Sequence, residues 1–520
     1  MEIDKSEQYV TLSYTWGDSG VIKTTDTTIS SFRAGVPLST LPETLRDVIN
    51  VTRSIGVKYI WIDSLCIIQD QELENTDFSR EAPHMGEIYT NSLLTIAASR
   101  FKGTHSSCFS TRISSMLKPP RFNAPADFIS QRYGSNYFYV IDEGCWKSAV
   151  SDAPLNSRGW VLQERLLSPR TVHFCKEQTF WECSGLEACE SLPTGFPEFF
   201  IISELPAVTN QLPRFQQTLS TAQNKPQLPL QVGIAKRPEK NFRSFKNTMN
   251  FQNDPPETGS PGKLIDSQLK STSYERWLLI IEAYTRCDLT NPTDRVVAIA
   301  GVAARLKGVL NDTFVAGLWK ERIMYGLAWR IANRVKGKRP LSRDGREVYC
   351  GPSWSWVSVV GGITHDKSRV RWEDWTQCAV VESCVVQPSN EEFHQPVSRG
   401  TALRLRGRLQ PLYYRAKPVD TGRWRDPVLS SSHFACGYVK IRHGIRLDST
   451  TTDDHWNDQL AVVPFLRAND LVFALILRKG KDGYQRIGLY YSSGGTSENR
   501  EAILDVLFHS AVVESSFQIV

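Results

Sequence analysis

The stretch Lys58-Tyr-Ile-Trp-Ile-Asp-Ser-Leu-Cys-Ile-Ile-Gln-Asp70 carries the clearest structural signal in the chain. Its run of bulky apolar residues ends at Ile62, and Asp63, Ser64 and Cys66 follow within four positions. A short apolar run of this kind is typical of a strand that is buried on both faces. Open α/β sheets bind ligands at the carboxyl ends of their strands, so the polar residues after Ile62 mark a candidate ligand crevice.

The residues before this stretch predict a strand and a helix. Residues 9–13 alternate and are rich in β-branched side chains, which predicts a first strand. Residues 41–56 place their apolar side chains on one helical face, with Thr40 and Glu43 as a capping box and Gly56 as a left-handed stop. A strand, a helix and a second strand in this order predict two parallel strands.

The same pattern continues to about residue 190. We predict a helix at 81–89, a third strand at 93–98, and a helix at 156–167 that Ser168-Pro169 ends. A strand pair follows at 171–174 and 178–182. Residues 1–190 are therefore predicted to form a small α/β domain built on a parallel sheet.

The remainder of the chain changes character twice. Residues 191–270 are rich in Pro, Gln, Asn and Lys, which predicts an insertion or linker that is partly disordered. Residues 271–340 are predicted to be helical, including a helix at 318–335. Residues 341–520 are predicted to be mostly β, with a hairpin at 471–491.

Composition narrows the class of protein. The 520 residues are 41% hydrophobic and 22% charged, which is ordinary for a globular protein. A net charge of +6 is small for this length and argues against nucleic-acid binding. Apolar runs are too short for a membrane span. Eleven cysteines without framework spacing, and no signal peptide, predict reduced thiols and a cytoplasmic location.

The common catalytic signatures are absent from the sequence. It has no phosphate-binding loop, no GxGxxG after a strand, no GxSxG elbow, no HExxH and no CxxC pair. Cys175, Cys183 and Cys189 lie near His173, but their spacings match no zinc module, and we interpret His173 as a core histidine. We therefore predict no metal site and assign no cofactor.

Three blocks occur together in a fixed order. They are Tyr9-Val-Thr-Leu-Ser-Tyr-Thr-Trp-Gly17; Leu41-Pro-Glu-Thr with 59–70, 85–91 and 94–98; and Arg158-Gly-Trp-Val-Leu-Gln-Glu-Arg-Leu-Leu-Ser-Pro-Arg170 with Phe174 and 178–183. Over residues 8–183 the chain closely resembles the HET (heterokaryon incompatibility) domain of filamentous fungi. The stretches 291–301, 315–319 and 351–358 resemble segments that often follow this domain.

The chain departs from the family pattern in two respects. Thr15 stands where many members carry Cys, so activity here does not require a thiol at this position. The first block also begins almost at Met1, whereas many relatives have a region before it, which leaves open a truncated start or a dispensable upstream element.

The resemblance implies an effector of heterokaryon (vegetative) incompatibility, in which non-self recognition leads to growth arrest and programmed cell death. HET domains are regarded as distantly similar to TIR domains, which implies a TIR-like or flavodoxin-like sheet. Some TIR domains cleave NAD at the nicotinamide–ribose bond with one essential Glu. NAD is therefore a candidate substrate, and the implied partners are a nucleotide ligand, a second copy of the chain, or an allelic non-self protein.

Glu164 is the best candidate for the catalytic carboxylate of such a cleavage, because an oxocarbenium-like state is stabilised by a nearby negative charge. Trp160 precedes it by one helical turn and is placed to stack on a base. Arg158 and Arg165 suit phosphate contacts. Asp63 is the second catalytic candidate. The other predicted ligand-binding residues are Ser13, Tyr14, Trp16, Gly17, Ser64, Cys66 and Gln163.

Each of these residues also has a structural interpretation. Glu164 is a potential ion-pair partner of Arg165 or Arg170, Asp63 a cap of the following turn, and Cys66 a buried small hydrophobe. Two other functions stay open: an enzyme of fungal secondary metabolism that reuses the fold, and a non-enzymatic signalling or interaction module. If the chain is an enzyme, we expect a hydrolase that acts like an NAD glycohydrolase.

Overall fold

The computed structural model describes most of the chain. The residues outside the description are 1–6, 18–20, 70–75, 113–116, 118, 120, 124–136, 140–141, 143, 197–245, 247–261, 333–339, 343–344, 366–373, 387–396, 415–426, 430–438, 441–444, 449–458, 470, 493–496 and 510–511. The predicted insertion at 191–270 lies largely among them.

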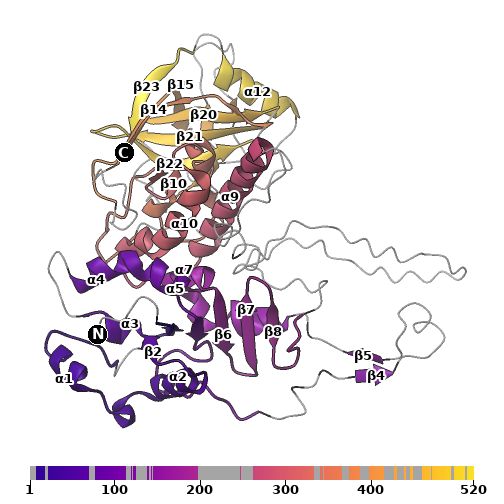
Figure 1. Cartoon of the computed structure of the whole chain (residues 1–520). Helices are drawn as coiled ribbons and strands as arrows, with labels where there is room; N and C mark the ends of the chain where they lie inside the picture. The colour runs from indigo at the N-terminus through magenta and orange to yellow at the C-terminus, as the bar shows by residue number, and fades with distance from the viewer. Residues whose placement is uncertain are drawn as a thin grey trace, which may run out of the picture.

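The N-terminal region is built on a six-stranded sheet (Figure 1). Its strands, in spatial order, are β2 (Tyr59–Trp61), β1 (Tyr9–Ser13), β3 (Leu94–Ala97), β6 (Arg170–Phe174), β7 (Thr179–Cys183) and β8 (Glu187–Cys189). The first four strands are parallel, and β6, β7 and β8 pair antiparallel. The predicted strands are confirmed, and the sheet is mixed rather than wholly parallel.

Strand β2 differs from the prediction in one respect. We expected it to be buried on both faces, but all three of its residues are half-buried. The reason is its place in the sheet, because among the described strands β2 pairs with β1 alone and forms one edge. The apolar run predicts a strand correctly but not its position among the other strands.

The predicted first helix is α2 (Glu43–Ser54), which buries Leu45 and Val48 against the sheet. The predicted capping box does not form, because Pro42 is the N-cap and the Thr40 hydroxyl donates to the Pro37 carbonyl. Gly56 follows the helix with φ +78°, the left-handed conformation expected of a glycine stop. The short helices α1 (Ile29–Ala34) and η1 (Leu38–Thr40) precede α2.

Short helices connect β2 to β3 and β3 to β6. They are α3 (Asp63–Cys66), α4 (Asp77–Glu81), η2 (Ala82–His84), α5 (Met85–Thr90), η4 (Lys147–Ser151), η5 (Pro154–Ser157) and α7 (Gly159–Leu167), and between β3 and η4 lies the hairpin of β4 (Arg121–Asn123) and β5 (Tyr137–Tyr139). Every residue of α7 except Trp160 is buried. Figure 1 shows α4, α5 and α7 between the N-terminal sheet and the rest of the molecule.

The region after residue 261 begins with helices. They are α9 (Gly262–Tyr284), η6 (Pro292–Arg295), η7 (Val297–Ile299) and α10 (Ala300–Leu310). The helix predicted at 318–335 is wrong. The chain there forms β10 (Leu318–Trp319), α11 (Ile323–Gly326) and β11 (Arg330–Ile331), and β10 pairs with β9 (Phe314–Val315). Gly317, at φ +91°, makes the tight turn of this hairpin where the Trp356 indole approaches it closely.

The C-terminal region is mostly β, as predicted. The main path of its 11-stranded sheet is β14 (Val380–Val385), β15 (Ala402–Gly407), β23 (Ser515–Ile519), β22 (Tyr484–Tyr491), β21 (Leu471–Lys479), β20 (Leu460–Ala468), β16 (Gln410–Tyr414), β17 (Pro427–Leu429) and β18 (Val439–Lys440). Off this path, β13 (Thr376–Gln377) pairs with β20, and β19 (Ile445–Leu447) with β22. The other elements are β12 (Ile363–Thr364), η8 (Trp356–Ser358) and α12 (Ser497–Phe508). The predicted hairpin is β21–β22.

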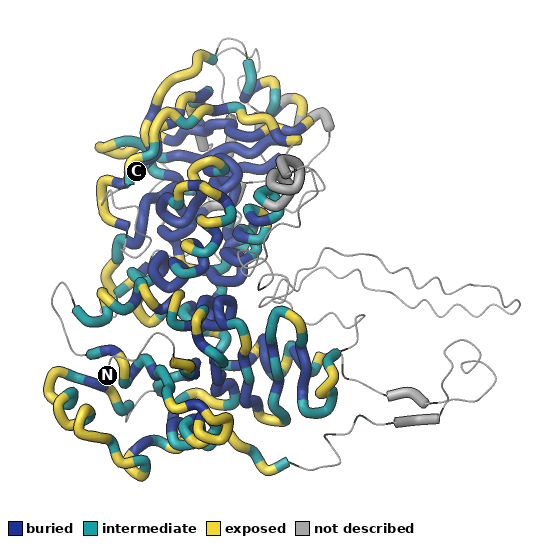
Figure 2. The backbone as a smooth tube through the Cα atoms, in the orientation of Figure 1, coloured by how far each residue is buried: buried dark blue, intermediate teal, exposed yellow. Residues whose placement is uncertain are grey.

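One large core joins these regions. It runs from Tyr89 on α5 and Leu166 on α7, through α9 and α10, to the C-terminal sheet. Figure 2 shows the buried backbone continuing between the lower and upper parts of the view. Gly86 and Gly301 meet where α5 contacts α10, and a Cβ on Gly301 would lie 2.7 Å from the Gly86 Cα. No helix among the described residues is long and apolar enough to cross a membrane.

Candidate functional site

The order of the parallel strands creates a topological switch point at the carboxyl ends of β1, β2 and β3. Strand β1 lies between β2 and β3. The chain therefore places β2 on one side of β1 and then crosses to place β3 on the other side. In open α/β sheets the carboxyl ends at such a switch point are where ligands bind. Ser13 ends β1 here, and Asp63 follows β2.

Asp63 is held by two donors. Oδ2 accepts a hydrogen bond from the Trp16 indole Nε1 at 2.9 Å, and Oδ1 accepts one from the Ser64 backbone N–H at 2.7 Å. The Tyr14 hydroxyl donates to the Ser64 hydroxyl at 2.7 Å. Burial raises the pKa of the Asp63 carboxyl, and the Trp16 bond and the Arg158 charge oppose that rise. Asp63 thus begins α3, whose N-cap is Ile62 without a side-chain cap, and its carboxyl lies at the switch point of the sheet.

Glu164 reaches the same cluster from α7. It is 6% exposed, and burial raises the pKa of its carboxyl to about 7. The nearby Arg158 charge and the Ser13 hydroxyl favour its ionised form, whereas the Asp63 charge favours the protonated form. Neither Arg165 nor Arg170 pairs with this carboxylate: Arg165 binds Glu182, and Arg170 donates to the Leu93 carbonyl.

Three further groups surround the two carboxylates. Arg158 donates to the Tyr14 carbonyl, which anchors its guanidinium beside the end of β1. The Tyr89 hydroxyl lies beside the Glu164 carboxyl and donates to the Leu12 carbonyl at 3.1 Å. The Ser13 hydroxyl is buried beside Glu164, and its hydrogen-bonding contact lowers the pKa of the Glu164 carboxyl.

This cluster lies within the part of the chain that a family model matches. The model for heterokaryon incompatibility protein (HET) covers residues 9–164, from the start of β1 to Glu164 itself. The chain carries a HET domain. The resemblance is thereby confirmed over residues 9–164, which include the first two blocks and the start of the third. No curated protein and no solved structure matches the chain significantly.

Other predicted residues of the HET domain lie around the cluster. Gly17 adopts φ +85° and its Cα is approached by Gly103, so it forms a tight turn after Trp16. Trp160 packs edge-on against Phe78 at 5.9 Å, and its Nε1 donates to Asp294 at 3.4 Å. These contacts hold Trp160 between α4 and the helices that follow the HET domain.

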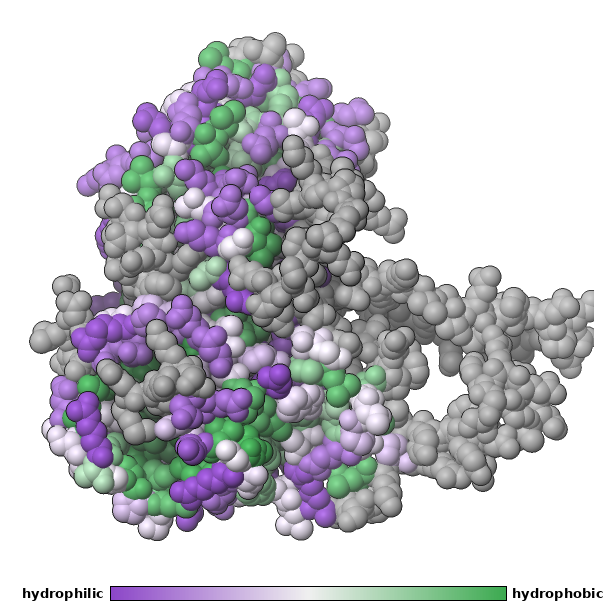
Figure 3. All heavy atoms as spheres, in the orientation of Figure 1, coloured by the Kyte–Doolittle hydropathy of each residue, from purple (hydrophilic) through white to green (hydrophobic). Residues whose placement is uncertain are grey.

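Cys66 corrects one prediction. We expected a buried small hydrophobe, but Cys66 is exposed at the last position of α3. The single turn of α3 explains the difference, since it directs Ser64 inward and leaves Cys66 on its outer side. Figure 3 shows that apolar residues gather on the N-terminal part of the viewed face.

Gln163 and Arg165 flank Glu164 but contact other parts of the molecule. The Gln163 side-chain oxygen accepts from the Gly301 backbone N–H at 2.7 Å, near the start of α10. Arg165 makes two hydrogen bonds to Glu182, at 2.8 and 3.1 Å. The structure therefore brings Glu164 to the cluster with Asp63 and Arg158, and places its two neighbours outside that cluster.

Glu182 is the centre of a second, fully buried cluster. Its carboxylate also contacts His173 Nε2 at 3.1 Å and lies 4.0 Å from the Lys246 ammonium. Arg165 and Lys246 hold the pKa of Glu182 well below its usual range, and burial lowers the pKa of His173 to about 4. His173 is neutral at pH 7 and is a core histidine, as predicted. Its Nδ1 is buried without a hydrogen-bond partner in the described part of the chain.

Sequence reasoning missed Tyr89 as a member of the site. The helical pattern placed Tyr89 on an apolar face, which is correct because it is 1% exposed. A buried Tyr still needs a partner for its hydroxyl, and that requirement was the available signal. Burial and the Glu164 charge raise the pKa of Tyr89, so it remains a hydrogen-bond donor near neutral pH.

Proposed function

We propose that the chain is an effector of heterokaryon incompatibility and programmed cell death, whose TIR-like HET domain hydrolyses cytoplasmic NAD. In this proposal the trigger is self-association or binding of a non-self partner protein. The observation that carries the proposal is the pair of carboxylates at the switch point of the sheet. Glu164 is buried with a pKa of about 7, and Asp63 is half-buried and held by Trp16.

The surroundings of Glu164 and of Asp63 suit the two carboxyls to different roles in the proposed reaction. A base works best when its pKa lies near the working pH, which supports Glu164 as the group that accepts a proton from water. Asp63 is nearer the solvent, and its carboxylate is suited to accept hydrogen bonds from the ribose hydroxyls. Arg158 offers a positive charge for the diphosphate, and the half-buried Trp16 ring offers a stacking surface for a base. Two carboxyls whose environments differ are typical of acid–base sites.

The hydrolysis of NAD needs no reactant other than water. The bond between C1′ of the ribose and the nicotinamide nitrogen breaks, and its electron pair neutralises the pyridinium ring. Water adds to C1′ and passes one proton to the Glu164 carboxylate, so the products are ADP-ribose, nicotinamide and a proton. The negative charge of Glu164 also stabilises the oxocarbenium-like state before water adds.

The test is NAD consumption by the purified full chain, followed by chromatography of nicotinamide and ADP-ribose. Glu164→Gln keeps the shape of the side chain and removes the base, so we expect a loss of at least about 100-fold in rate. Glu87→Gln is the matched control, because Glu87 lies on the neighbouring α5 but is 80% exposed. It should leave the rate unchanged.

Two results would contradict the proposal. The first is full NAD hydrolysis by the Glu164→Gln variant with its thermal unfolding unchanged. The second is growth arrest on expression of the wild-type chain without any loss of NAD, which would favour a non-enzymatic signalling role.

A further inference from the structure

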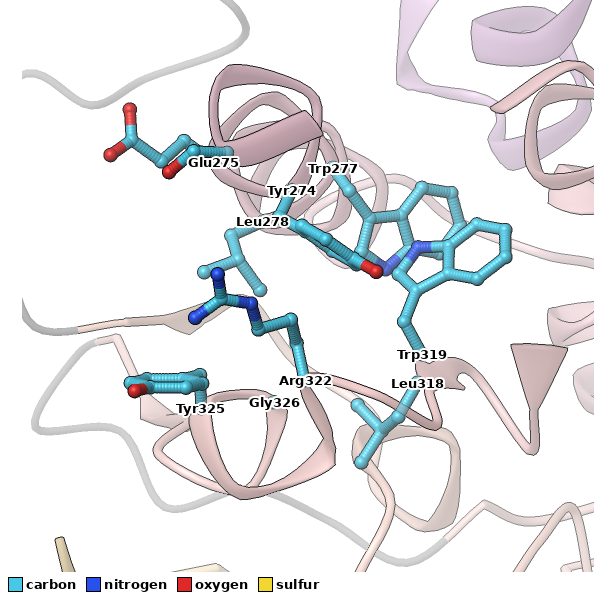
Figure 4. A pocket seen from close by; sticks show the side chains of 10 residues that line it. Tyr274, Glu275, Trp277, Leu278, Leu318, Trp319, Arg322, Tyr325 and Gly326 are labelled. Atoms are coloured by element: carbon cyan, nitrogen blue, oxygen red, sulfur yellow. The ribbon is translucent and has the colours of Figure 1, made fainter. Parts of the chain in front are cut away.

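A cavity outside the HET domain opens between α9, β10 and α11 (Figure 4). About 480 Å³ of space lies in and in front of it, and part of this space is open solvent. Trp277 and Trp319 form its inner wall, are 2% and 3% exposed, and have ring centroids 5.8 Å apart. Tyr274 and Leu278 on α9 line it nearer to the solvent. The lining favours a flat apolar body.

Trp319 also provides a hydrogen-bond donor. Its Nε1 is buried and has no hydrogen-bond partner in the described part of the chain. Figure 4 shows this nitrogen on the side of the indole that faces Tyr274 and Arg322. A buried N–H without an acceptor is costly, so a ligand that brings an acceptor gains free energy at this point.

Arg322 supplies a positive charge at the same cavity. Its guanidinium carbon lies 5.6 Å from the Tyr274 ring centroid and 5.3 Å from that of Tyr325. Among the described residues it forms no ion pair within 4.0 Å, and Glu275, the acid in the lining, points away in Figure 4. A guanidinium oriented by aromatic rings is suited to a carboxylate.

The nearest buried acid does not replace such a ligand. Asp312 accepts hydrogen bonds from the Tyr274 hydroxyl at 2.9 Å and from the backbone N–H groups of Thr313 and Glu321 at 2.6 and 3.1 Å. Its charge is therefore held by the β9–β10 hairpin and by Tyr274. The cavity itself presents donors, from Trp319 and Arg322, on an apolar wall.

We propose that this cavity binds a small arylalkyl carboxylate. The ring packs against Trp277, Trp319 and Leu278, where edge-to-face contacts add to the burial of apolar surface. The carboxylate accepts hydrogen bonds from the Arg322 guanidinium and the Trp319 indole N–H. This site is separate from the HET-domain carboxylates and does not depend on NAD hydrolysis.

The experiment is titration of the full chain with indole-3-acetate and 3-phenylpropionate, by calorimetry and saturation-transfer NMR. Their primary amides are the controls for charge. We expect at least one acid to bind at least about tenfold more tightly than its amide, which is the difference expected for a charged hydrogen bond. Binding of neither acid at millimolar concentration, or equal binding of acid and amide, would overturn the proposal.

Variants locate the binding. Arg322→Met keeps the length of the side chain and should remove the preference for the acid over its amide. Trp319→Phe keeps an aromatic wall but should weaken binding of the acid severalfold. Lys320→Met is the matched control, since Lys320 is exposed close by and does not line the cavity. The proposed site would be contradicted if both cavity variants bound the acid as the wild type does. It would also be contradicted if Lys320→Met weakened binding of the acid as much as the cavity variants do. Thermal unfolding of each variant shows that it is folded.

Discussion

The Trp16 indole donates a hydrogen bond to Oδ2 of Asp63 over 2.9 Å, and so ties the loop after β1 to the first turn of α3. The two residues are 47 positions apart in the chain. Because β1 and β2 are adjacent and parallel, their carboxyl ends lie side by side, and this bond joins the segments that follow them. The loop after β1 thereby becomes part of the site.

Replacing Trp16 by Phe tests this bond. The change keeps an aromatic ring but leaves Oδ2 of a half-buried carboxylate without its donor, so we expect a loss of about 1 to 3 kcal/mol of unfolding free energy. Urea unfolding measures it. Tyr59→Phe is the control, because the Tyr59 hydroxyl at the start of β2 bonds to no described residue, and its loss should change little. Equal effects of the two changes would contradict the role of Trp16.

Glu164 predicts a specific dependence of stability on pH. Its pKa is about 7 in the folded chain against an ordinary value of 4.5, so between these values the folded state binds more protons than the unfolded state. The contribution of Glu164 to the unfolding free energy therefore falls as pH rises through this window, by about 3 kcal/mol in total. Urea unfolding of the wild type and Glu164→Gln at several pH values gives this contribution as their difference. A difference that does not vary with pH would contradict the raised pKa.

The buried cluster around Glu182 predicts a large loss of stability. Glu182→Gln leaves the Arg165 and Lys246 charges buried without their counter-charge, which is expected to cost about 3 to 5 kcal/mol. His173 does not compensate, because it is already neutral at pH 7. Thermal and urea unfolding measure the loss. Glu177→Gln, in a solvent-exposed pair with Lys176, is the control and should have little effect. A small loss in Glu182→Gln would mean that water reaches these charges.

The contact of α5 with α10 predicts that Gly301→Ala destabilises the chain. The added Cβ would lie 2.7 Å from the Gly86 backbone and 2.9 Å from the Gln163 side chain, so the helices must separate, at a cost of about 1 to 3 kcal/mol. Gly185→Ala is a control, because a Cβ there meets nothing within 4 Å. If Gly301→Ala unfolds like the wild type, the two helices are not packed through these glycines.

Local pattern predicted much of the fold. The alternation of 9–13, the one-sided helix before Gly56 and the apolar run at 59–62 correctly predicted β1, α2 and β2. They did not predict that β2 is an edge strand, because the order of strands depends on contacts that are distant in sequence. The predicted helix at 318–335 failed for a similar reason. Its apolar residues serve the β9–β10 hairpin and the core rather than one helical face.

The site could be predicted only in part from the sequence. Asp63, Trp16, Arg158 and Glu164 were candidates, and the structure brings them together. The sequence did not distinguish the roles of three consecutive residues of α7. Gln163 binds α10, Glu164 lies beside Asp63 and Arg158, and Arg165 binds Glu182. A helix that is buried on nearly all sides has no solvent face, so its pattern does not reveal which residue meets which neighbour.

The most direct test of the carboxylate site is infrared spectroscopy of the Glu164 side chain. The difference spectrum between the wild type and Glu164→Gln isolates the C=O stretch of this one protonated carboxyl, and its intensity is followed with pH. We predict that the band disappears with a midpoint near pH 7, because burial beside Asp63 disfavours the charged form. A midpoint near 4.5, the ordinary value for Glu, would contradict the account.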